Sequence, residues 1–169
     1  GINCSVTRPM KKGLDDSIKN WERSILVNSS ATFLFNKYLC NYFKKNNIKG
    51  KIVNIGSIYG TIGPDFNLYK NENFIIEPDY FYNKFGMHGL TKFFASKFGK
   101  NNININMISP GGILGKQSMS FKKKYSKKTF LNRMALETEF NDLAEFLISE
   151  KSSYITGQNL IADGGYTSN

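Results

Sequence analysis

Apolar residues recur along the chain in two patterns, which predict two kinds of secondary structure. Short runs rich in apolar residues and bounded by Gly, Asn or Pro predict buried strands. These runs cover residues 51–55, 103–108 and 159–162. Apolar residues at helical spacing predict helices. They cover residues 16–45 with a break near the start, 80–99, 118–125 and 139–149. In the helix at 80–99 we expect a packing stripe, formed by Met87, Leu90, Phe93, Phe94 and Phe98.

Strands and helices alternate along the chain, which is typical of a sheet whose parallel strands are joined by helices. The sequence therefore predicts an α/β protein with a Rossmann-like parallel sheet flanked by helices. The chain has 169 residues, enough for one hydrophobic core. Neither internal repeats nor low-complexity linkers divide it. We expect a single domain that covers residues 1–169.

Small and polar residues follow the predicted strands. Ser57 comes after the strand at 51–55, a Pro-Gly-Gly turn at 110–112 follows the second strand, and an Asp-Gly-Gly turn at 163–165 follows the third. In open α/β sheets, ligands bind at the carboxyl ends of the strands. Because glycine has no side chain, we expect the turn at 110–112 to let a flat ligand approach the backbone.

Tyr80 stands four residues before Lys84 at the start of the predicted helix at 80–99. Residues at this spacing share one helical face, so the phenol and the ammonium group are neighbours. A phenol ionises near pH ~10 in water, and a nearby cation favours the phenolate, so such a pair can transfer protons near neutral pH. Tyr and Lys are both abundant here, and a solvated helical face is the alternative explanation.

These motifs follow one another as strand with Ser, helix with Tyr and Lys, strand with Pro-Gly and strand with Asp-Gly-Gly. This order resembles the short-chain dehydrogenase/reductase family over nearly the whole chain. By the resemblance, Ser57 hydrogen-bonds the substrate oxygen and Tyr80 is the acid/base that moves the hydroxyl proton. Lys84 matches the lysine that favours the tyrosinate and holds the nicotinamide ribose. Asn28 matches the asparagine that anchors a water of the proton relay, so all four members of the family's catalytic tetrad are present.

The resemblance also implies a nicotinamide cofactor, NAD or NADP, and a set of cofactor-binding positions. These are Asn3, Tyr80, Lys84, Pro110, Gly111, Gly112 and Ile113. In the family, the Pro-Gly turn lies beside the nicotinamide ring, and the backbone at the position of Ile113 binds the carboxamide. Gly115 stands where many relatives have a Thr that bonds the carboxamide, which predicts weaker cofactor binding. Asn3 keeps the first position of a family Asn-Asn-Ala-Gly turn whose glycine is replaced here.

One part of the family pattern has no match in the sequence. No Gly-rich phosphate-binding turn stands between a strand and a helix near the start. We therefore interpret the chain as the carboxyl-terminal portion of such an enzyme, whose sheet lacks the amino-terminal βαβ strands of the cofactor cradle. The residue that selects NAD or NADP would belong to those strands, so the choice between the two cofactors stays open.

The segment between the serine and the tyrosine is longer than in most of the family, and its extra residues 63–77 are polar and aromatic. Phe66, Tyr69 and Phe74 in this segment are suited to stack on a sugar or another polar ring as a substrate lid. A surface insertion packed by its own aromatic residues is the alternative. The run SIYGTIGPDFNLY at 57–69 resembles the oxidoreductases linked to flagellin and surface-glycan modification, whose substrates are sugar derivatives. The same subgroup is indicated by the PGGI turn, Gln117, Phe121 and Tyr125.

Charge and composition narrow the function classes. A net charge of +10 would attract nucleic-acid phosphates, but the lysines are scattered and alternate with Asn, so we expect a solvated surface and no nucleic-acid partner. By the resemblance, the lysine cluster at 121–128 lies over the active site, where it would attract an anionic substrate. The two cysteines lack metal-ligand spacing and His88 is the one histidine, so no metal site is expected. No apolar run is long enough to span a membrane and no signal peptide is visible, which predicts a cytoplasmic protein without a membrane partner.

Two functions fit these features. The first is an NAD(P)-dependent oxidoreductase that acts on an alcohol or ketone, with a sugar derivative favoured by the subgroup. The second is a catalytically silent fragment or assembly module, because without the Gly-rich turn the cofactor loses most of its anchoring charge contacts. The resemblance further implies a homo-oligomer, a dimer or a tetramer, that forms through the two long helices at 16–45 and 80–99.

Overall fold

The computed structural model describes residues 2–3, 8–72, 74 and 76–169, without the side chains of residues 2 and 3. Its centre is a parallel sheet with the strand order β1-β2-β3-β4. The strands are β1 (Ile2–Asn3), β2 (Gly50–Ile55), β3 (Ile103–Pro110) and β4 (Asn159–Ala162). All three strands expected from the sequence are present, and the prediction of an α/β protein with a Rossmann-like parallel sheet is confirmed.

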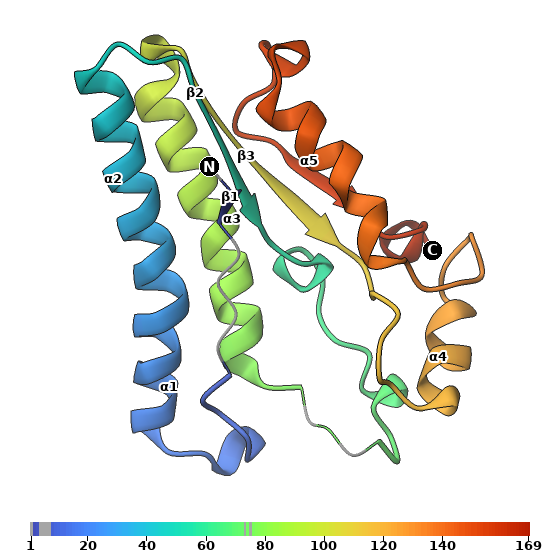
Figure 1. The fold of residues 1–169 in the computed structure, drawn as a ribbon. Helices are drawn as coiled ribbons and strands as arrows, with labels where there is room; N and C mark the ends of the chain where they lie inside the picture. Colours follow the sequence, from blue (N-terminus) through green and yellow to red (C-terminus); the bar gives the residue numbers. More distant parts are fainter. Residues whose placement is uncertain (1, 4–7, 73, 75) are drawn as a thin grey trace.

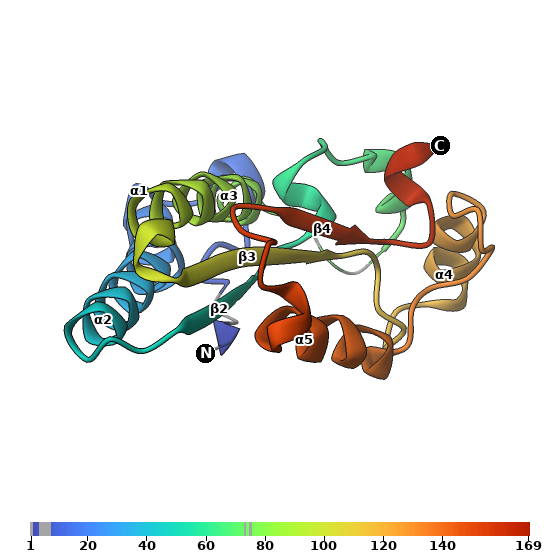
Figure 2. The same cartoon turned by 90° about the horizontal axis from the view of Figure 1, so that it is seen from above.

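Helices connect these strands and flank the sheet. They are α1 (Ile18–Ser24), α2 (Ala31–Lys45), α3 (Pro78–Phe98), α4 (Met119–Ser126) and α5 (Asn141–Ile148). Shorter 3₁₀ turns include Ile58–Gly60, Phe66–Leu68 and Glu137–Phe140. Figures 1 and 2 show α1, α2 and α3 on one face of the sheet and α5 on the other.

The first long helix differs from its prediction in the place of its interruption. The sequence pattern suggested a break near the start, but α1 and α2 are joined in the middle by a π-helical turn, Ile25–Ser30. A π turn widens the helix by one residue without ending it. The sequence pattern did not reveal this turn.

Two apolar clusters hold the helices to the two faces of the sheet. On one face, Ile52 and Ile105 pack with Cys40 of α2 and Phe94 of α3. On the other face, Val53 and Ile108 pack with Leu147 of α5. Within α3, Met87, Phe94 and Phe98 are buried as predicted. Phe93 was wrongly assigned to this stripe: its side chain is 57% exposed, because it points away from the sheet.

A buried chain of polar side chains also connects α2, β2 and α3. Asn36 Nδ2 donates to Asn54 Oδ1 at 3.0 Å, and Asn54 Nδ2 donates to Thr91 Oγ1 at 3.0 Å. All three residues are fully buried. Because buried polar groups are costly unless they are hydrogen-bonded, this chain fixes the two helices relative to the strand that leads to Ser57.

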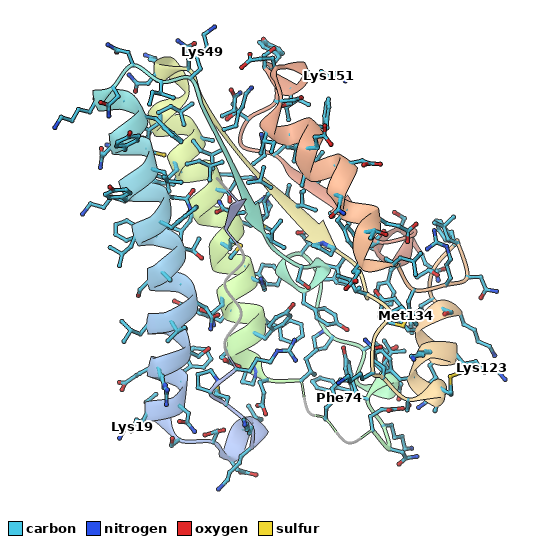
Figure 3. The ribbon with its side chains drawn as sticks, viewed as in Figure 1. Lys19, Lys49, Phe74, Lys123, Met134 and Lys151 are labelled. Carbon is cyan, nitrogen blue, oxygen red and sulfur yellow. The ribbon has the colours of Figure 1, made fainter. Side chains whose placement is uncertain are left out.

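A third cluster lies beyond the carboxyl ends of the strands and is largely aromatic. Its buried members are Ile58, Tyr59, Leu68, Phe121, Tyr125, Met134 and Tyr166. From the segment at 63–77, Tyr69 and Phe74 both pack on Phe121, whereas Phe66 is 68% exposed. Figure 3 shows Phe74 and Met134 in this region, while the labelled lysines project outward at the periphery. Among the described residues, no helix is long and apolar enough to cross a membrane.

Candidate active site

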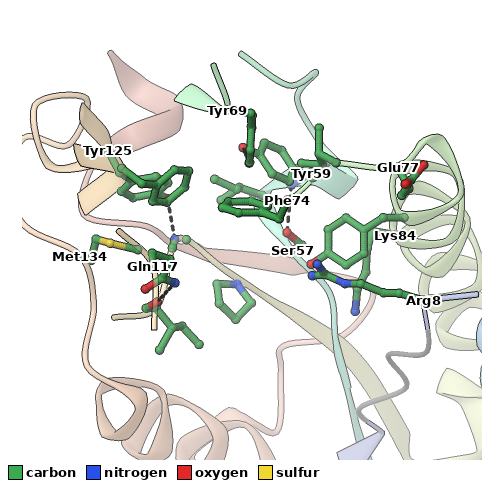
Figure 4. A pocket seen from close by; sticks show the side chains of 18 of the residues that line it. Arg8, Ser57, Tyr59, Tyr69, Phe74, Glu77, Lys84, Gln117, Tyr125 and Met134 are labelled. Carbon is green, nitrogen blue, oxygen red and sulfur yellow. Dashed lines mark hydrogen bonds between the residues drawn. The ribbon is translucent and has the colours of Figure 1, made fainter. Parts of the chain in front are cut away.

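A pocket of about 630 Å³ opens at the carboxyl ends of β2 and β3. Its volume is within the range of small-molecule sites, roughly 300–1,000 Å³. Seven of the residues predicted from the sequence line it: Ser57, Tyr80, Lys84, Pro110, Gly111, Gly112 and Ile113. In Figure 4, Ser57 lies between Lys84 and Arg8 on one side and Tyr125, Met134 and Gln117 on the other. The fold therefore brings together residues that are far apart in the sequence.

Ser57 is held in place by the 3₁₀ turn that follows β2. The side chain is 7% exposed, and its Oγ accepts a hydrogen bond from the backbone N–H of Tyr59 at 3.2 Å. This turn lies directly against α3, because a Cβ atom at Gly60 would stand 2.8 Å from the carbonyl oxygen of Lys84. The positions of the serine and of the helix are thus coupled through backbone contact.

Tyr80 and Lys84 lie on the first two turns of α3, which begins at Pro78, a residue that suits the first helical position. Lys84 is 3% exposed, and its Nζ donates to the carbonyl oxygen of Ile55 at 2.9 Å. The same Nζ lies 5.7 Å from the centre of the Tyr80 ring, and Cζ of Arg8 lies 4.8 Å from it. Two positive charges therefore stand beside the phenol ring.

Asn28 does not line the pocket. It lies in the π-helical turn, 5% exposed, and its Nδ2 donates to the carbonyl oxygen of Ser24 at 3.0 Å. The Ser24 hydroxyl in turn donates to Asp79, the neighbour of Tyr80. Asn28 is therefore linked to the start of α3 through Ser24 and Asp79. Its expected role as an anchor for water stays a prediction.

Both glycines of the turn at 110–112 lie in close contact with other parts of the chain. A Cβ atom at Gly111 would stand 2.8 Å from Cα of Asp163, and one at Gly112 would stand 2.6 Å from Cζ of Tyr125. The space beside both glycines is thus filled by this chain itself. The N–H of Gly112 donates to the Tyr125 hydroxyl at 2.5 Å. Packing within this chain therefore leaves no room for a side chain at either position. Both glycines also line the pocket, and the expected approach of a flat ligand to this turn stays a prediction.

The loop after this turn is closed by Gln117. Its Nε2 donates to the carbonyl oxygen of Ile113 at 2.9 Å, and its Oε1 accepts from the N–H of Gly115 at 2.8 Å. Gln117 thus holds the backbone of Ile113 in place. The predicted contact between Ile113 and a carboxamide stays a prediction.

Asn3 lies partly outside the described residues. Its backbone pairs with Asn54 in the sheet, but its side chain and residues 4–7, which contain the rest of the expected turn and Cys4, are not described. The cofactor role of Asn3 therefore stays a prediction.

Sequence reasoning missed several residues of the pocket wall. Arg8 and Glu77 bring opposite charges to it, and no motif marks either of them. Tyr59 was missed as well; its hydroxyl forms a hydrogen bond of 2.6 Å with that of Tyr69, which the sequence did predict as a pocket residue. Burial raises the pKa of the Tyr69 phenol to about 12, so this pair stays neutral at physiological pH. Tyr59 belongs to the SIYG run at 57–60, and this run was the available signal for it.

Two comparisons with known proteins agree with this geometry. A model of the family described as Enoyl-(Acyl carrier protein) reductase matches residues 2–167. The crystal structure of a short chain dehydrogenase from Leptospira borgpetersenii with bound NAD+ superposes with a TM-score of 0.87 and 36% sequence identity. The chain belongs to the short-chain dehydrogenase/reductase family. The match covers 98% of this chain and 63% of the Leptospira chain.

Curated members of the short-chain dehydrogenase/reductase family are also similar. Glucose 1-dehydrogenase 2 of Bacillus subtilis is 33% identical over 99% of this chain and 61% of its own length. Post-translational flagellin modification protein A of Campylobacter coli is 30% identical over 85% of this chain and 56% of its own length. The chain thus spans about three-fifths of the length of these relatives.

Proposed function

We propose that the chain carries the catalytic centre of an NAD(P)-dependent oxidoreductase that interconverts an alcohol and a ketone. The observation that carries this proposal is one pocket, at the carboxyl ends of parallel strands, lined together by Ser57, Tyr80 and Lys84. Ligands of open α/β folds bind at this edge of the sheet. The short-chain dehydrogenase/reductase membership of the chain supports the same reaction class.

The described residues fit the nicotinamide end of NAD or NADP. The buried ammonium group of Lys84 and the half-exposed Ile113 line the same pocket as Ser57. Lys84 would bind the ribose hydroxyls, the backbone of Ile113 would bind the carboxamide, and Pro110 would lie beside the ring, with Asn3 as a further contact. When bound, the nicotinamide supplies the hydride-transfer chemistry. The NAD+ in the Leptospira relative supports a cofactor of this kind.

The chain's own residues would handle the proton and the substrate oxygen. The Ser57 hydroxyl donates to the substrate oxygen and orients it. The Tyr80 phenol exchanges a proton with that same oxygen, and the charges of Lys84 and Arg8 stabilise the negative charge that develops on the phenol. Asn28 connects the site to solvent.

The substrate that this pocket suits best is a sugar derivative. Aromatic side chains line one side of the pocket, and rings of this kind pack against the apolar faces of sugars. Two relatives carry names connected with glucose oxidation and with flagellin modification. The choice between NAD and NADP rests on residues outside this pocket.

The long helices provide the surface for a homo-oligomer, a dimer or a tetramer. Large apolar side chains are exposed along them: Leu26, Phe33, Leu34, Tyr38, Tyr42, Phe85 and Phe93. Exposed apolar patches of this extent mark association surfaces. The cytoplasmic location expected from the sequence is part of this proposal.

The test is turnover by the wild-type chain and by Tyr80→Phe, with Tyr154→Phe as the matched control at a fully exposed position. NADH and NADPH formation is followed by absorbance across a panel of alcohols. Loss of the phenolic proton is expected to lower kcat by roughly 10²–10⁴-fold, while Tyr154→Phe matches the wild type. Full activity of Tyr80→Phe would refute the proposed mechanism. A folded wild-type chain without turnover would favour the silent or assembly module.

A further inference from the structure

One buried hydroxyl group connects helix α1 to the first turns of α3. Ser24 is the last residue of α1, which lies beside α3 (Figures 1 and 2), and its side chain is fully buried. Its Oγ donates a hydrogen bond to Oδ2 of Asp79 and accepts one from Nδ2 of Asn83 at 3.0 Å. It also accepts from Nδ2 of Asn28 at 3.3 Å. A hydroxyl has one proton and two lone pairs, so these three bonds use its whole hydrogen-bonding capacity.

Two partners of this hydroxyl are direct neighbours of residues that the proposed reaction uses. Asp79 precedes Tyr80, and Asn83 precedes Lys84. The members of each pair, 79 with 83 and 80 with 84, are four residues apart and share one face of α3. Successive residues of an α-helix lie about 100° apart around its axis. The bonds that hold the face of Asp79 therefore also set the direction of the face that carries Tyr80.

Burial makes these bonds strong constraints on the helix. Asp79 is 2% exposed and Asn83 is 5% exposed, and hydrogen bonds to a carboxylate are roughly twice as strong as those between neutral groups. Ser29 extends the network, because its Oγ donates to Oδ1 of Asn83 at 2.5 Å. A rotation of α3 would separate buried partners that have no access to water, at the full cost of leaving them unpaired.

We propose that Ser24 is a positioning residue, whose hydroxyl fixes the rotation of α3 through Asp79 and Asn83 and thereby sets the directions of Tyr80 and Lys84 in the pocket. The same hydroxyl holds the amide of Asn28. Ser24 is not among the residues that line the pocket, so it acts on the reaction through the helix. The effect on the rate rests on the proposed function, whereas the effect on the direction of Tyr80 is measured without turnover.

The test uses two variants of Ser24 and two controls. Ser24→Ala removes the shared hydroxyl, and Ser24→Cys replaces it by a weaker donor and acceptor. Ser30→Ala is the matched control, since this half-buried serine of the same long helix makes no capping bond at the start of α2. Leu147→Val controls for a loss of stability, because it weakens the apolar core on the other face of the sheet.

The direction of Tyr80 is measured by fluorine NMR of the chain labelled with 3-fluorotyrosine. The sequence contains 9 tyrosines, and the Tyr80 resonance is assigned by its absence in Tyr80→Phe. Ser24→Ala is expected to shift or broaden this resonance, and Ser24→Cys should do so less. Ser30→Ala and Leu147→Val should leave it at its wild-type position. The resonance of the exposed Tyr154, assigned with Tyr154→Phe, is the internal reference.

Turnover is measured with the alcohol on which the wild type is fastest in the panel. A misplacement of 1 Å can cost ~100-fold in rate, so a smaller shift of Tyr80 predicts a decrease in kcat of roughly tenfold for Ser24→Ala. The solvent deuterium isotope effect on kcat should rise, because proton exchange at a misplaced Tyr80 becomes the slower step. Ser24→Cys should lie between Ser24→Ala and the wild type. Ser30→Ala and Leu147→Val should match the wild type in kcat, although Leu147→Val lowers Tm.

The two proposals fail in different ways. An unchanged Tyr80 resonance in Ser24→Ala would overturn the role of Ser24, as would a loss of kcat no larger than that of Leu147→Val. If Ser24→Ala does not fold, Ser24→Cys decides by the same two measurements. A wild type that turns over no alcohol would refute the proposed function, yet the Tyr80 resonance would still decide the role of Ser24. Turnover with an unchanged resonance would refute the role of Ser24 alone.

Discussion

Replacing Gly60 by Ala inserts one methyl group between the two halves of the site. The added Cβ would stand 2.8 Å from the carbonyl oxygen of Lys84 and 3.0 Å from its carbonyl carbon. Ordinary contact begins at 3.4 Å, so the turn that holds Ser57 and helix α3 must separate by about 0.6 Å. Both partners are backbone, and neither can rotate away.

The cost follows from this displacement. Overpacking in a closely packed region costs about 1–3 kcal/mol, and the lower entropy of the unfolded Ala variant returns about 0.4–1 kcal/mol. We therefore expect a net loss of about 1–2 kcal/mol, a decrease in Tm of roughly 2–8 °C for a domain of this size. A misplacement of 1 Å can cost ~100-fold in rate, so a shift of about half that size predicts a decrease in kcat/KM of roughly tenfold.

Gly63→Ala is the matched control, because within the described part of the chain no atom lies within 4 Å of a Cβ at that position. Thermal unfolding is followed by circular dichroism, and kcat/KM by the absorbance of NADH. If Gly60→Ala matched Gly63→Ala in both Tm and kcat/KM, the contact between the Ser57 turn and α3 would not set the geometry of the site.

Three further predictions concern the buried interior and one helix surface. Asn54→Ala removes the hydrogen bonds to Asn36 and Thr91. The free energy of unfolding, measured by urea titration, is expected to decrease by about 2–4 kcal/mol. A decrease below about 0.5 kcal/mol would contradict the role of this polar chain. Partial burial and the charge of Lys92 lower the pKa of His88 in the folded chain. As pH falls, His88 is therefore protonated at a higher pH in the unfolded chain than in the folded chain. The free energy of unfolding should decrease as pH falls through about 6.5. His88→Gln should remove that dependence, and an unchanged pH profile would contradict it. Burial raises the pKa of the Cys40 thiol to about 11. In a Cys4→Ser variant, Ellman's reagent should therefore react at least ~100-fold more slowly with the folded chain than with the urea-unfolded chain. Similar rates would show that the thiol is accessible.

The sheet and the centre of the site were predictable from the sequence because they depend on local signals. Runs rich in apolar residues marked the strands. Ser57 follows one of these strands, and Tyr80 and Lys84 lie in a helix whose type was clear. The pairing of these elements then follows from the rule that parallel strands place their carboxyl ends at one edge.

The features that were missed depend on contacts between residues distant in sequence. The space beside Gly112 is filled by Tyr125, and a glycine pattern cannot distinguish a neighbour of the same chain from a ligand. Phe93 follows helical apolar spacing yet faces away from the sheet. Arg8 and Glu77 are single charged residues, and their place in the pocket wall depends on the path of the chain around them.

The segment at 63–77 lines the pocket but does not carry Ser57 or Lys84. It supplies Tyr69, Phe74 and Glu77 to the pocket, and its described residues form no strand of the sheet. Ser57 and Lys84, by contrast, are fixed by the end of β2 and by α3. Under the proposed function, we expect substitutions of Tyr69 or Phe74 to alter substrate preference while Ser57 and Lys84 keep their positions. The exposed positions of the segment, such as Phe66, can change without loss of the apolar cluster, whereas Leu68 is part of it.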